Sequence, residues 1–103
     1  LGRAGLGLDA IDLIEINEAF AAMPLVSTKL LGAGDPAAIE ALRRKTNANG
    51  GAIAVGHPTG ATGGRLLLTA ALELRRRGGG RALVTMCGGI GEGEAFVLRV
   101  DRD

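Results

Sequence analysis

The chain has 103 residues, which is enough for one small domain or for a piece of a larger one. Apolar residues make up 47% of it, but there is no Trp or Tyr and only two Phe, so small aliphatic side chains must form most of any core. The formal net charge of +1, spread over interspersed acids and bases, excludes an electrostatic footprint for nucleic acid or for an anionic membrane surface.

The first third of the chain is predicted to contain a strand followed by a helix. Residues 1–8 are rich in glycine and are interpreted as the tail of an earlier helix. The apolar run 12–16 contains β-branched residues and predicts a strand. A helix is expected to follow, with Asn17 as a candidate cap and Pro24 as a point of kinking or delay. We expect this helix to end at Gly32.

A second, amphipathic helix is predicted to begin after Asp35, because Asp is favoured as an N-cap and Pro36 suits the first helical position. Its basic residues 43–45 are expected to point outward, and we interpret it as a solvated cover helix. The Gly-rich segment 46–64 then predicts a loop, a short apolar segment and a second loop.

The last third contains the strongest predicted helix, residues 65–77, which is apolar almost all round and is therefore expected to be deeply buried. Its final turn contains the basic run Arg75–Arg77, interpreted either as cations placed against the helix dipole or as a contact with a phosphate. Glycines at 78–80 end the helix. Residues 81–86 and 94–100 predict strands separated by a Gly-rich turn. This order predicts an α/β protein with a mixed sheet and packed helical layers.

Cysteine usage and the lack of targeting patterns indicate the compartment. One Cys rules out an internal disulfide and indicates a reducing environment. No apolar stretch approaches the roughly 20 residues of a membrane helix, and the N-terminus lacks the regions of a signal peptide. We therefore expect a cytoplasmic protein without a membrane partner. Because the chain opens at Leu1 rather than at Met, we expect it to be a piece of a longer protein.

Three polar side chains are predicted to stand at the ends of elements, where functional residues tend to lie. Asn17 follows the first strand, His57 lies in a Gly-rich loop, and Cys87 follows a later strand. Cys and His together can transfer protons and attack acyl groups, and an Asn nearby can orient a water or an oxyanion donor. The two glycines after Cys87 allow backbone N–H groups to approach a substrate closely.

Each of these residues also has a purely structural interpretation. Cys87 is compatible with a small buried apolar residue, His57 with a structural imidazole, and Asn17 with a helix cap. The glycine loop lacks the Gly-Lys-Ser/Thr of a phosphate-binding loop and the glycine spacing of a dinucleotide fingerprint. One His and one Cys cannot form a conventional zinc site unaided, so no metal site is predicted.

Three segments of the chain, taken together, resemble the motifs of the C-terminal half of thiolases, which are acetyl-CoA acetyltransferases and 3-ketoacyl-CoA thiolases. These segments are EINEAFA at 15–21, NGGAIAVGHPTGATGGR at 49–65 and CGGIGEG at 87–93. The resemblance covers nearly the whole chain, with the motifs in order. It implies one unit, residues 1–103, that is the C-terminal portion of a layered α-β-α domain with an incomplete mixed sheet.

The resemblance implies a role for each matching position. His57 would deprotonate a nucleophilic cysteine and stabilise a thioester oxygen. Asn17 would position a water in one oxyanion hole, and the backbone N–H of Gly89 would be a donor in a second. Cys87 would move the proton on the α-carbon of the attacking acyl-CoA.

Substrate-binding positions and partners are implied as well. Phe20 would lie near the bound acyl or pantetheine group, and Gly56 belongs to the turn that presents the imidazole. The implied substrates are acyl-CoA and CoA, with no separate cofactor. Thiolases are dimers or tetramers, so the resemblance implies a homo-oligomer for the longer protein.

The chain departs from the family pattern in one respect. A thiolase carries a second cysteine, the one that becomes acylated, in its N-terminal half, and that half is absent here. We therefore expect the chain alone to show no turnover, and we expect the missing half to leave exposed, sticky apolar patches. Two alternatives stay open: a small acyl hydrolase with Cys87 as nucleophile and His57 as base, and a non-catalytic assembly module with the thiolase fold.

Overall fold

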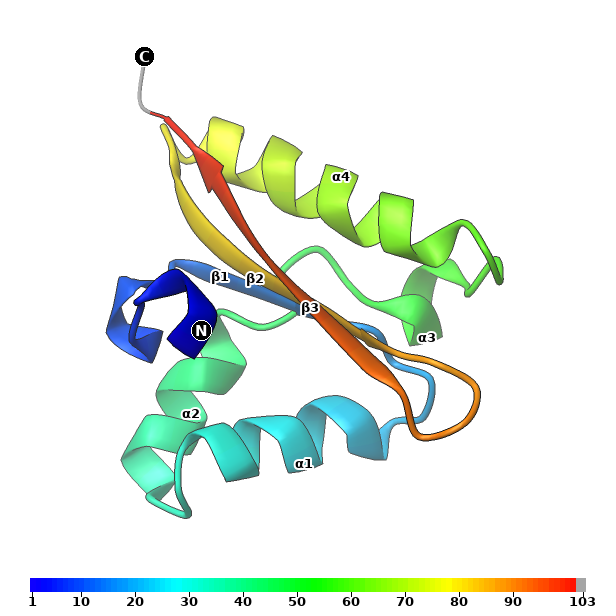
Figure 1. The fold of residues 1–103 in the computed structure, drawn as a ribbon, viewed down its shortest axis with the longest axis horizontal. Coiled ribbons are helices and arrows are strands. Elements are labelled where there is room, and N and C mark those ends of the chain that lie inside the picture. The colour runs from blue at the N-terminus through cyan, green and yellow to red at the C-terminus, as the bar shows by residue number, and fades with distance from the viewer. Residues whose placement is uncertain (102–103) are drawn as a thin grey trace.

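The computed structural model describes residues 1–101 and places helices on both faces of a three-stranded sheet (Figure 1). Helix α4 (Thr62–Arg76) lies on one side, and α1 (Ala22–Leu31) and α2 (Pro36–Arg44) lie on the other. This arrangement confirms the predicted α/β class. The remaining elements are two 3-10 turns, Gly2–Ala4 and Leu8–Ala10, the short helix α3 (Ala52–Val55), and the strands β1 (Leu13–Ile16), β2 (Gly80–Cys87) and β3 (Gly93–Val100).

The sheet is mixed, as predicted, with the strand order β1–β2–β3. Strand β1 runs parallel to β2, with Ile16 opposite Thr85, and β3 returns antiparallel to β2. Parallel strands end at the same edge of a sheet, and ligands bind preferentially at that edge in α/β proteins. Asn17 and Cys87, which come at the carboxyl ends of β1 and β2, therefore leave the sheet close to one another.

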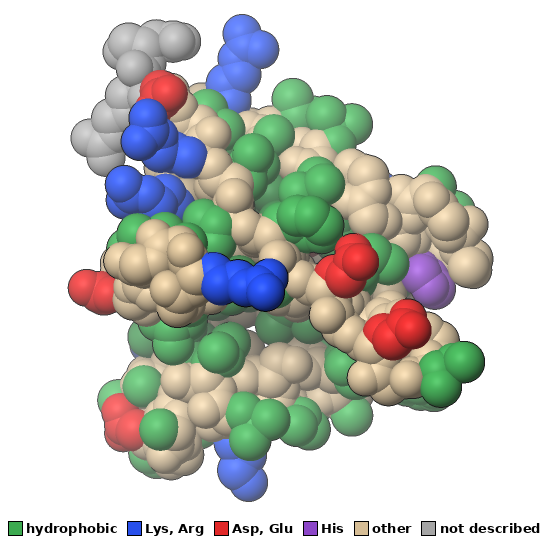
Figure 2. All heavy atoms as spheres, viewed as in Figure 1, with side chains coloured by type: hydrophobic (Ala, Val, Ile, Leu, Met, Phe, Trp, Pro, Cys, Tyr) green, Lys and Arg blue, Asp and Glu red, His purple; other side chains and the backbone are tan. Residues whose placement is uncertain are grey.

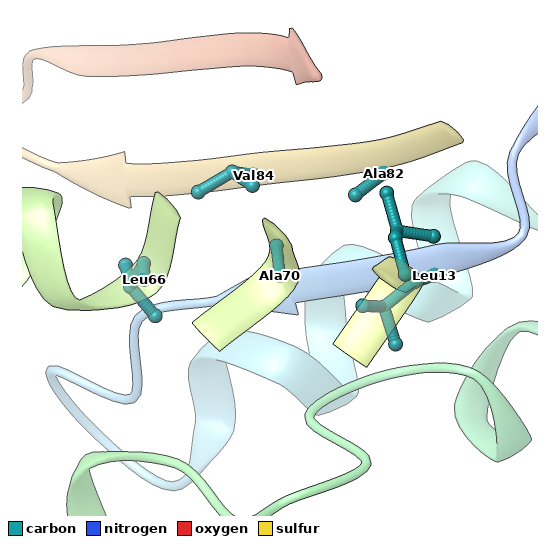
Figure 3. Close-up of a cluster of buried hydrophobic side chains, with 6 residues drawn as sticks. Leu13, Leu66, Ala70, Ala82 and Val84 are labelled. Carbon is teal, nitrogen blue, oxygen red and sulfur yellow. The ribbon is translucent and has the colours of Figure 1, made fainter. Parts of the chain in front are cut away.

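Small aliphatic side chains form a core on each face of the sheet. Burial of a Leu, Ile or Val side chain contributes about 1.5–3 kcal/mol, so these clusters hold the strand ends in place. The cluster between the sheet and α4 is shown in Figure 3 and consists of Leu13, Leu66, Ala70, Leu74, Ala82 and Val84. The cluster on the opposite face consists of Ile11, Ile14, Ile16, Leu42 and Leu83.

A short segment after α2, predicted as loop, pairs with the outer edge of β1. The N–H of Ile14 donates to the carbonyl of Lys45, and the N–H of Asn47 donates to the carbonyl of Ile14, both at 2.8 Å. The Asn47 side chain extends the pairing, because its Oδ1 accepts from the Ile16 N–H at 2.8 Å and its Nδ2 donates to the Ile16 carbonyl at 3.0 Å. These bonds satisfy the β1 edge and anchor the Gly-rich loop that follows.

The cap prediction for the first helix is wrong. Helix α1 begins at Ala22, five residues after Asn17, and its N-terminus has no side-chain cap. The backbone N–H of Asn17 instead donates to the carbonyl of Thr85 at 3.0 Å, which continues the sheet past the end of β1. By contrast, Asp35 caps α2 as predicted, since its carboxylate accepts from the N–H groups of Ala37 and Ala38.

The orientation predicted for Lys45 is also wrong. Its ammonium group donates to the carbonyls of Leu8, at 3.1 Å, and Ile11, at 2.5 Å. These carbonyls lie at the second 3-10 turn, where a cation is favourable. Residues 1–8, interpreted as the tail of a helix, contain one full 3-10 turn and the start of this second one.

Helix α4 is buried on one face only, contrary to prediction. Leu66, Ala70 and Leu74 are fully buried, but Leu68 and Leu72 are 60% and 56% exposed.

In the last turn of α4, two residues of the basic run bind a carboxylate of the same helix. Glu73 accepts from Arg76 at 2.7 and 2.8 Å and from Arg77 at 2.6 Å. The hydrogen bonds from Arg76 and then Arg77 hold the pKa of Glu73 below its ordinary value.

The layer formed by α1 leaves an apolar groove of about 500 Å³ against the sheet. Figure 2 shows hydrophobic side chains on the surface along α1 and beside this hollow. The groove is lined by Leu1, Ile14, Ile16, Ser27, Leu30, Leu31, Leu83, Thr85 and Ala95.

Within residues 1–101, no helix combines the length and the apolar character needed to cross a bilayer.

Candidate active site

Asn17 carries a buried side-chain amide at the carboxyl end of β1. Its side chain lies just past the end of β1, and the residue is only 2% exposed. Neither Oδ1 nor Nδ2 has a hydrogen-bond partner among residues 1–101. A buried polar group in this state costs about 1–3 kcal/mol, and native proteins rarely leave one without a reason. The amide therefore has both hydrogen-bonding functions available for a ligand or a water.

Cys87 ends β2 and lines a cavity of about 380 Å³ together with Asn17. The thiol is free and partly buried. The turn after it is closed by a hydrogen bond of 2.8 Å from the Gly88 N–H to the Glu92 carbonyl. Gly89 is exposed, and its N–H makes no hydrogen bond within residues 1–101, so it is available as a donor.

His57 lies on the turn between α3 and α4 and is exposed, and the single imidazole is visible at the surface in Figure 2. Gly56, before it, adopts a φ of 91°, a conformation that strongly favours glycine. Nδ1 of His57 lies 2.7 Å from the hydroxyl oxygen of Thr62, the first residue of α4. The imidazole is thus held by its own turn and does not line the cavity between Asn17 and Cys87.

The amino end of α4 nevertheless packs beside the end of β2. A Cβ atom added to Gly63 would lie 3.2 Å from Sδ of Met86, the residue before Cys87. Helix α4 is followed by β2 after a short glycine turn. Strand β2 therefore runs back along the helix, and its end lies beside the start of α4. The structure therefore brings Asn17 and Cys87 to one cavity and places the His57 turn at the same end of the fold.

Glu18 connects the segment after β1 to the loop that leads to His57. Its Oε2 accepts from the N–H of Ile53 at 2.9 Å, in the first turn of α3, where a carboxylate is favourable. Gly51 packs directly against this carboxylate, and a Cβ at that position would overlap it. The carboxylate of Glu18 thus lies at the N-terminus of α3 and not at that of α1.

Glu15 is a second buried polar residue whose side chain has no hydrogen-bond partner among residues 1–101. Glu15 is on the same face of β1 as Asn17, since side chains alternate along a strand, and it is fully buried. Neither of its carboxyl oxygens has a partner within residues 1–101, and neither do Nε and Nη2 of Arg65. Burial raises the pKa of Glu15 to about 7, against the opposing influence of the Arg65 charge.

Of the two expected substrate-binding positions, Phe20 is 76% exposed, and Gly56 is exposed next to His57. Neither lines the cavity shared by Asn17 and Cys87.

In the part of the chain that the structure describes, no three His, Cys, Asp or Glu residues are grouped so that they could hold a metal ion.

Sequence reasoning missed the two groups that hold the His57 loop, Thr62 and the carboxylate of Glu18. A hydroxyl residue five positions after a lone His, at a helix start, is a local signal that could have pointed to Thr62. The contact of Glu18 with Ile53 joins residues 35 apart, and no local pattern indicates it.

The fold and the site define a layered α/β protein with polar side chains at the carboxyl ends of two parallel strands, and comparison with known proteins identifies its family. The family model for the C-terminal domain of thiolases matches residues 1–100. The chain therefore belongs to the thiolase family.

Its relatives are much longer proteins. A probable acetyl-CoA acetyltransferase of Mycolicibacterium smegmatis is 57% identical over 97 residues, which are 94% of this chain and 23% of that protein. A beta-ketoadipyl-CoA thiolase of Pseudomonas aeruginosa is 48% identical, and the 3-oxoadipyl-CoA/3-oxo-5,6-dehydrosuberyl-CoA thiolase of Escherichia coli is 51% identical. Each of these two matches covers 98 residues, 95% of this chain and 23% of the relative. The chain thus spans less than a quarter of the length of these relatives.

Proposed function

We propose that this chain is the part of a thiolase-type acyltransferase that supplies acid–base and oxyanion-hole groups. The reaction is the reversible Claisen condensation and thiolytic cleavage of 3-ketoacyl-CoA, with acyl-CoA and CoA as substrates. The observation that carries the proposal is the cavity lined by both Asn17 and Cys87 at the carboxyl ends of two parallel strands, where the amide has no hydrogen-bond partner among residues 1–101.

Each residue has a chemical task in this proposal. Cys87 removes or returns the proton on the α-carbon of one acyl-CoA, and Asn17 holds a water that donates to the thioester oxygen. The Gly89 N–H is a donor in a second oxyanion hole. His57 takes the proton of a cysteine that carries the acyl group. Phe20 and Gly56 contact the substrate.

The acyl-carrying cysteine comes from chain outside these 103 residues, in the N-terminal half of the longer protein. Ping-pong acyl transfer requires a residue to hold the acyl group between the two half-reactions. The chain alone is therefore expected to be inactive, and the longer protein is proposed to be a homo-oligomer.

A chimera tests this function. Residues 1–100 replace the matching segment of the Mycolicibacterium smegmatis relative, and thiolysis of acetoacetyl-CoA is measured. We expect the chimera to be active and the chain alone to be inactive. His57→Ala and Cys87→Ser should each lower kcat/KM by roughly 10²–10⁴-fold, the usual contribution of a positioned acid or base.

The matched control is Arg44→Gln, because that side chain is 73% exposed at the far end of α2. It should leave activity unchanged. Full activity of the His57→Ala or Cys87→Ser chimera, or acetoacetyl-CoA cleavage by the isolated chain, contradicts the proposal.

The hydrolase alternative, in which Cys87 is the nucleophile and His57 its base, has less support. No hydrogen bond joins the two side chains within residues 1–101, and the His57 ring is bonded to Thr62 instead. Rapid labelling of Cys87 by iodoacetamide near neutral pH, lost in His57→Ala, would favour this alternative.

A further inference from the structure

The hydroxyl group of Thr62 contacts two atoms of the turn that carries His57, a ring nitrogen and a backbone carbonyl. Its oxygen is 2.7 Å from Nδ1 of His57 and 3.1 Å from the carbonyl oxygen of Pro58. Thr62 is fully buried, whereas His57 is exposed, so the protein fixes one side of the ring and leaves the other side open.

These two contacts determine which ring nitrogen carries the proton. A threonine hydroxyl has one hydrogen to donate and lone pairs to accept. If it donates to the carbonyl of Pro58, four residues earlier, it can only accept at its second contact. Nδ1 must then be the donor. In the opposite arrangement, the hydroxyl and carbonyl oxygens would face each other at 3.1 Å with no hydrogen between them.

We propose that Thr62 is a positioning residue that holds neutral His57 as the Nδ1–H tautomer and leaves the lone pair of Nε2 free to accept a proton. The role in catalysis rests on the proposed function, in which His57 acts as a base. The tautomer itself depends only on the turn.

The arrangement suits a proton transfer that starts from a neutral ring. When a thiol gives its proton to Nε2, the S–H bond breaks, an Nε2–H bond forms, and the electron pair stays on sulfur. The Nδ1–H bond to Thr62 is present before and after this step, so no group in the turn has to reorient. The hydroxyl thus orients the base as a third group does in a catalytic triad, but without a charge.

Because His57 is the only histidine, nitrogen NMR reports on this one ring without assignment. The chain is labelled with ¹⁵N-histidine, and long-range proton–nitrogen correlations are recorded in alkaline solution, where the ring is neutral. We expect the pattern of the Nδ1–H tautomer. A dominant Nε2–H pattern overturns the proposal, whatever the chimera assay shows.

Three variants separate positioning from a general structural effect. Thr62→Ser keeps the hydroxyl and should keep the Nδ1–H tautomer. Thr62→Val keeps the shape but removes the acceptor, and it should shift the tautomer ratio toward Nε2–H by about fivefold or more, which is the effect of one ordinary hydrogen bond. Thr69→Val, farther along α4, is the control and should change nothing.

If Thr62→Val does not fold, the wild-type and Thr62→Ser spectra still decide the question. An unchanged tautomer ratio in folded Thr62→Val contradicts the proposal. The two claims fail separately, because loss of the role of His57 would appear only in the chimera assay, and the wrong tautomer would appear only in the spectrum.

Discussion

The carboxylate of Glu18 and the backbone N–H of Ile53 are joined by a hydrogen bond of 2.9 Å, which connects the turn after β1 to the start of α3. Asn47 adds a contact to the same carboxylate at 3.4 Å. Because α3 leads directly into the turn that carries His57, this carboxylate fixes the imidazole loop relative to the strand end that carries Asn17.

This contact predicts the effect of Gly51→Ala. The φ of Gly51 is −108°, which any residue adopts, so the backbone itself imposes no cost. The new Cβ would overlap the Glu18 carboxylate and displace it from the N–H of Ile53 in α3. We expect a loss of about 1–2 kcal/mol in the free energy of unfolding, comparable to a lost helix cap. Urea unfolding followed by circular dichroism measures this change.

Two comparisons identify the cause. Gly64→Ala, in an open position on α4, should be neutral or slightly stabilising, because Ala favours the helix and no atom lies within 4 Å of the new Cβ. In a Glu18→Ala background, Gly51→Ala should become nearly neutral. An equal cost in both backgrounds would show that the carboxylate is not responsible.

The buried Glu15 predicts a pH dependence of stability. Its folded-state pKa is raised to about 7 from an ordinary value of 4.5, chiefly by burial, so the folded state binds more protons than the unfolded state between these two values. Stability should therefore fall as pH rises from about 4.5 to about 7, by roughly 1–3 kcal/mol after allowance for partial screening.

Glu15→Gln should remove this slope, since the amide does not titrate. Glu40→Gln is the matched control, because Glu40 is exposed on α2 and should leave the slope intact. Urea unfolding free energies at pH 5, 6, 7 and 8 provide the comparison. A wild-type slope that persists in Glu15→Gln would assign the titration to another group.

The features that were predicted correctly are determined by residues close together in the sequence. Asp35 and Pro36 start α2 through contacts within three residues, and the β-branched runs form strands where expected. The features that were missed depend on contacts between distant segments. Lys45 reaches the Leu8 carbonyl 37 residues away, and Asn47 pairs with Ile16 over 31 residues. No window of sequence contains such pairs.

In the candidate site, too, the features with a local sequence signal were predicted and those that depend on distant segments were not. Its residues could be proposed because polar side chains at strand ends and in glycine turns are conspicuous. Their convergence could be anticipated for Asn17 and Cys87 once β1 and β2 were known to be parallel. The exposed face of α4 could not be anticipated, because its leucines look the same in sequence whether this chain or another segment covers them.

Exposed apolar side chains beside the α1 groove predict self-association of the isolated chain. Leu30 lines the groove and is 74% exposed, and Leu31 beside it is 36% exposed. Leu30→Lys should weaken association by about tenfold or more, because burial of one leucine contributes about 1.5–3 kcal/mol. Sedimentation equilibrium measures this constant. Lys29→Gln, at the adjacent exposed position, should change it little, and a monodisperse monomer in the wild type contradicts the prediction.

The unpartnered amide of Asn17 predicts opposite effects on stability and on activity. Asn17→Leu replaces a buried amide, which has no side-chain hydrogen bond within residues 1–101, by an apolar side chain of similar size, and it keeps the backbone bond to Thr85. We expect the free energy of unfolding to rise by about 1 kcal/mol, because the desolvated amide is removed. In the chimera, kcat/KM should fall by roughly 10²–10³-fold, the typical effect of losing an oxyanion donor. A variant that is less stable than the wild type but equally active would mean that the amide serves the fold rather than the reaction.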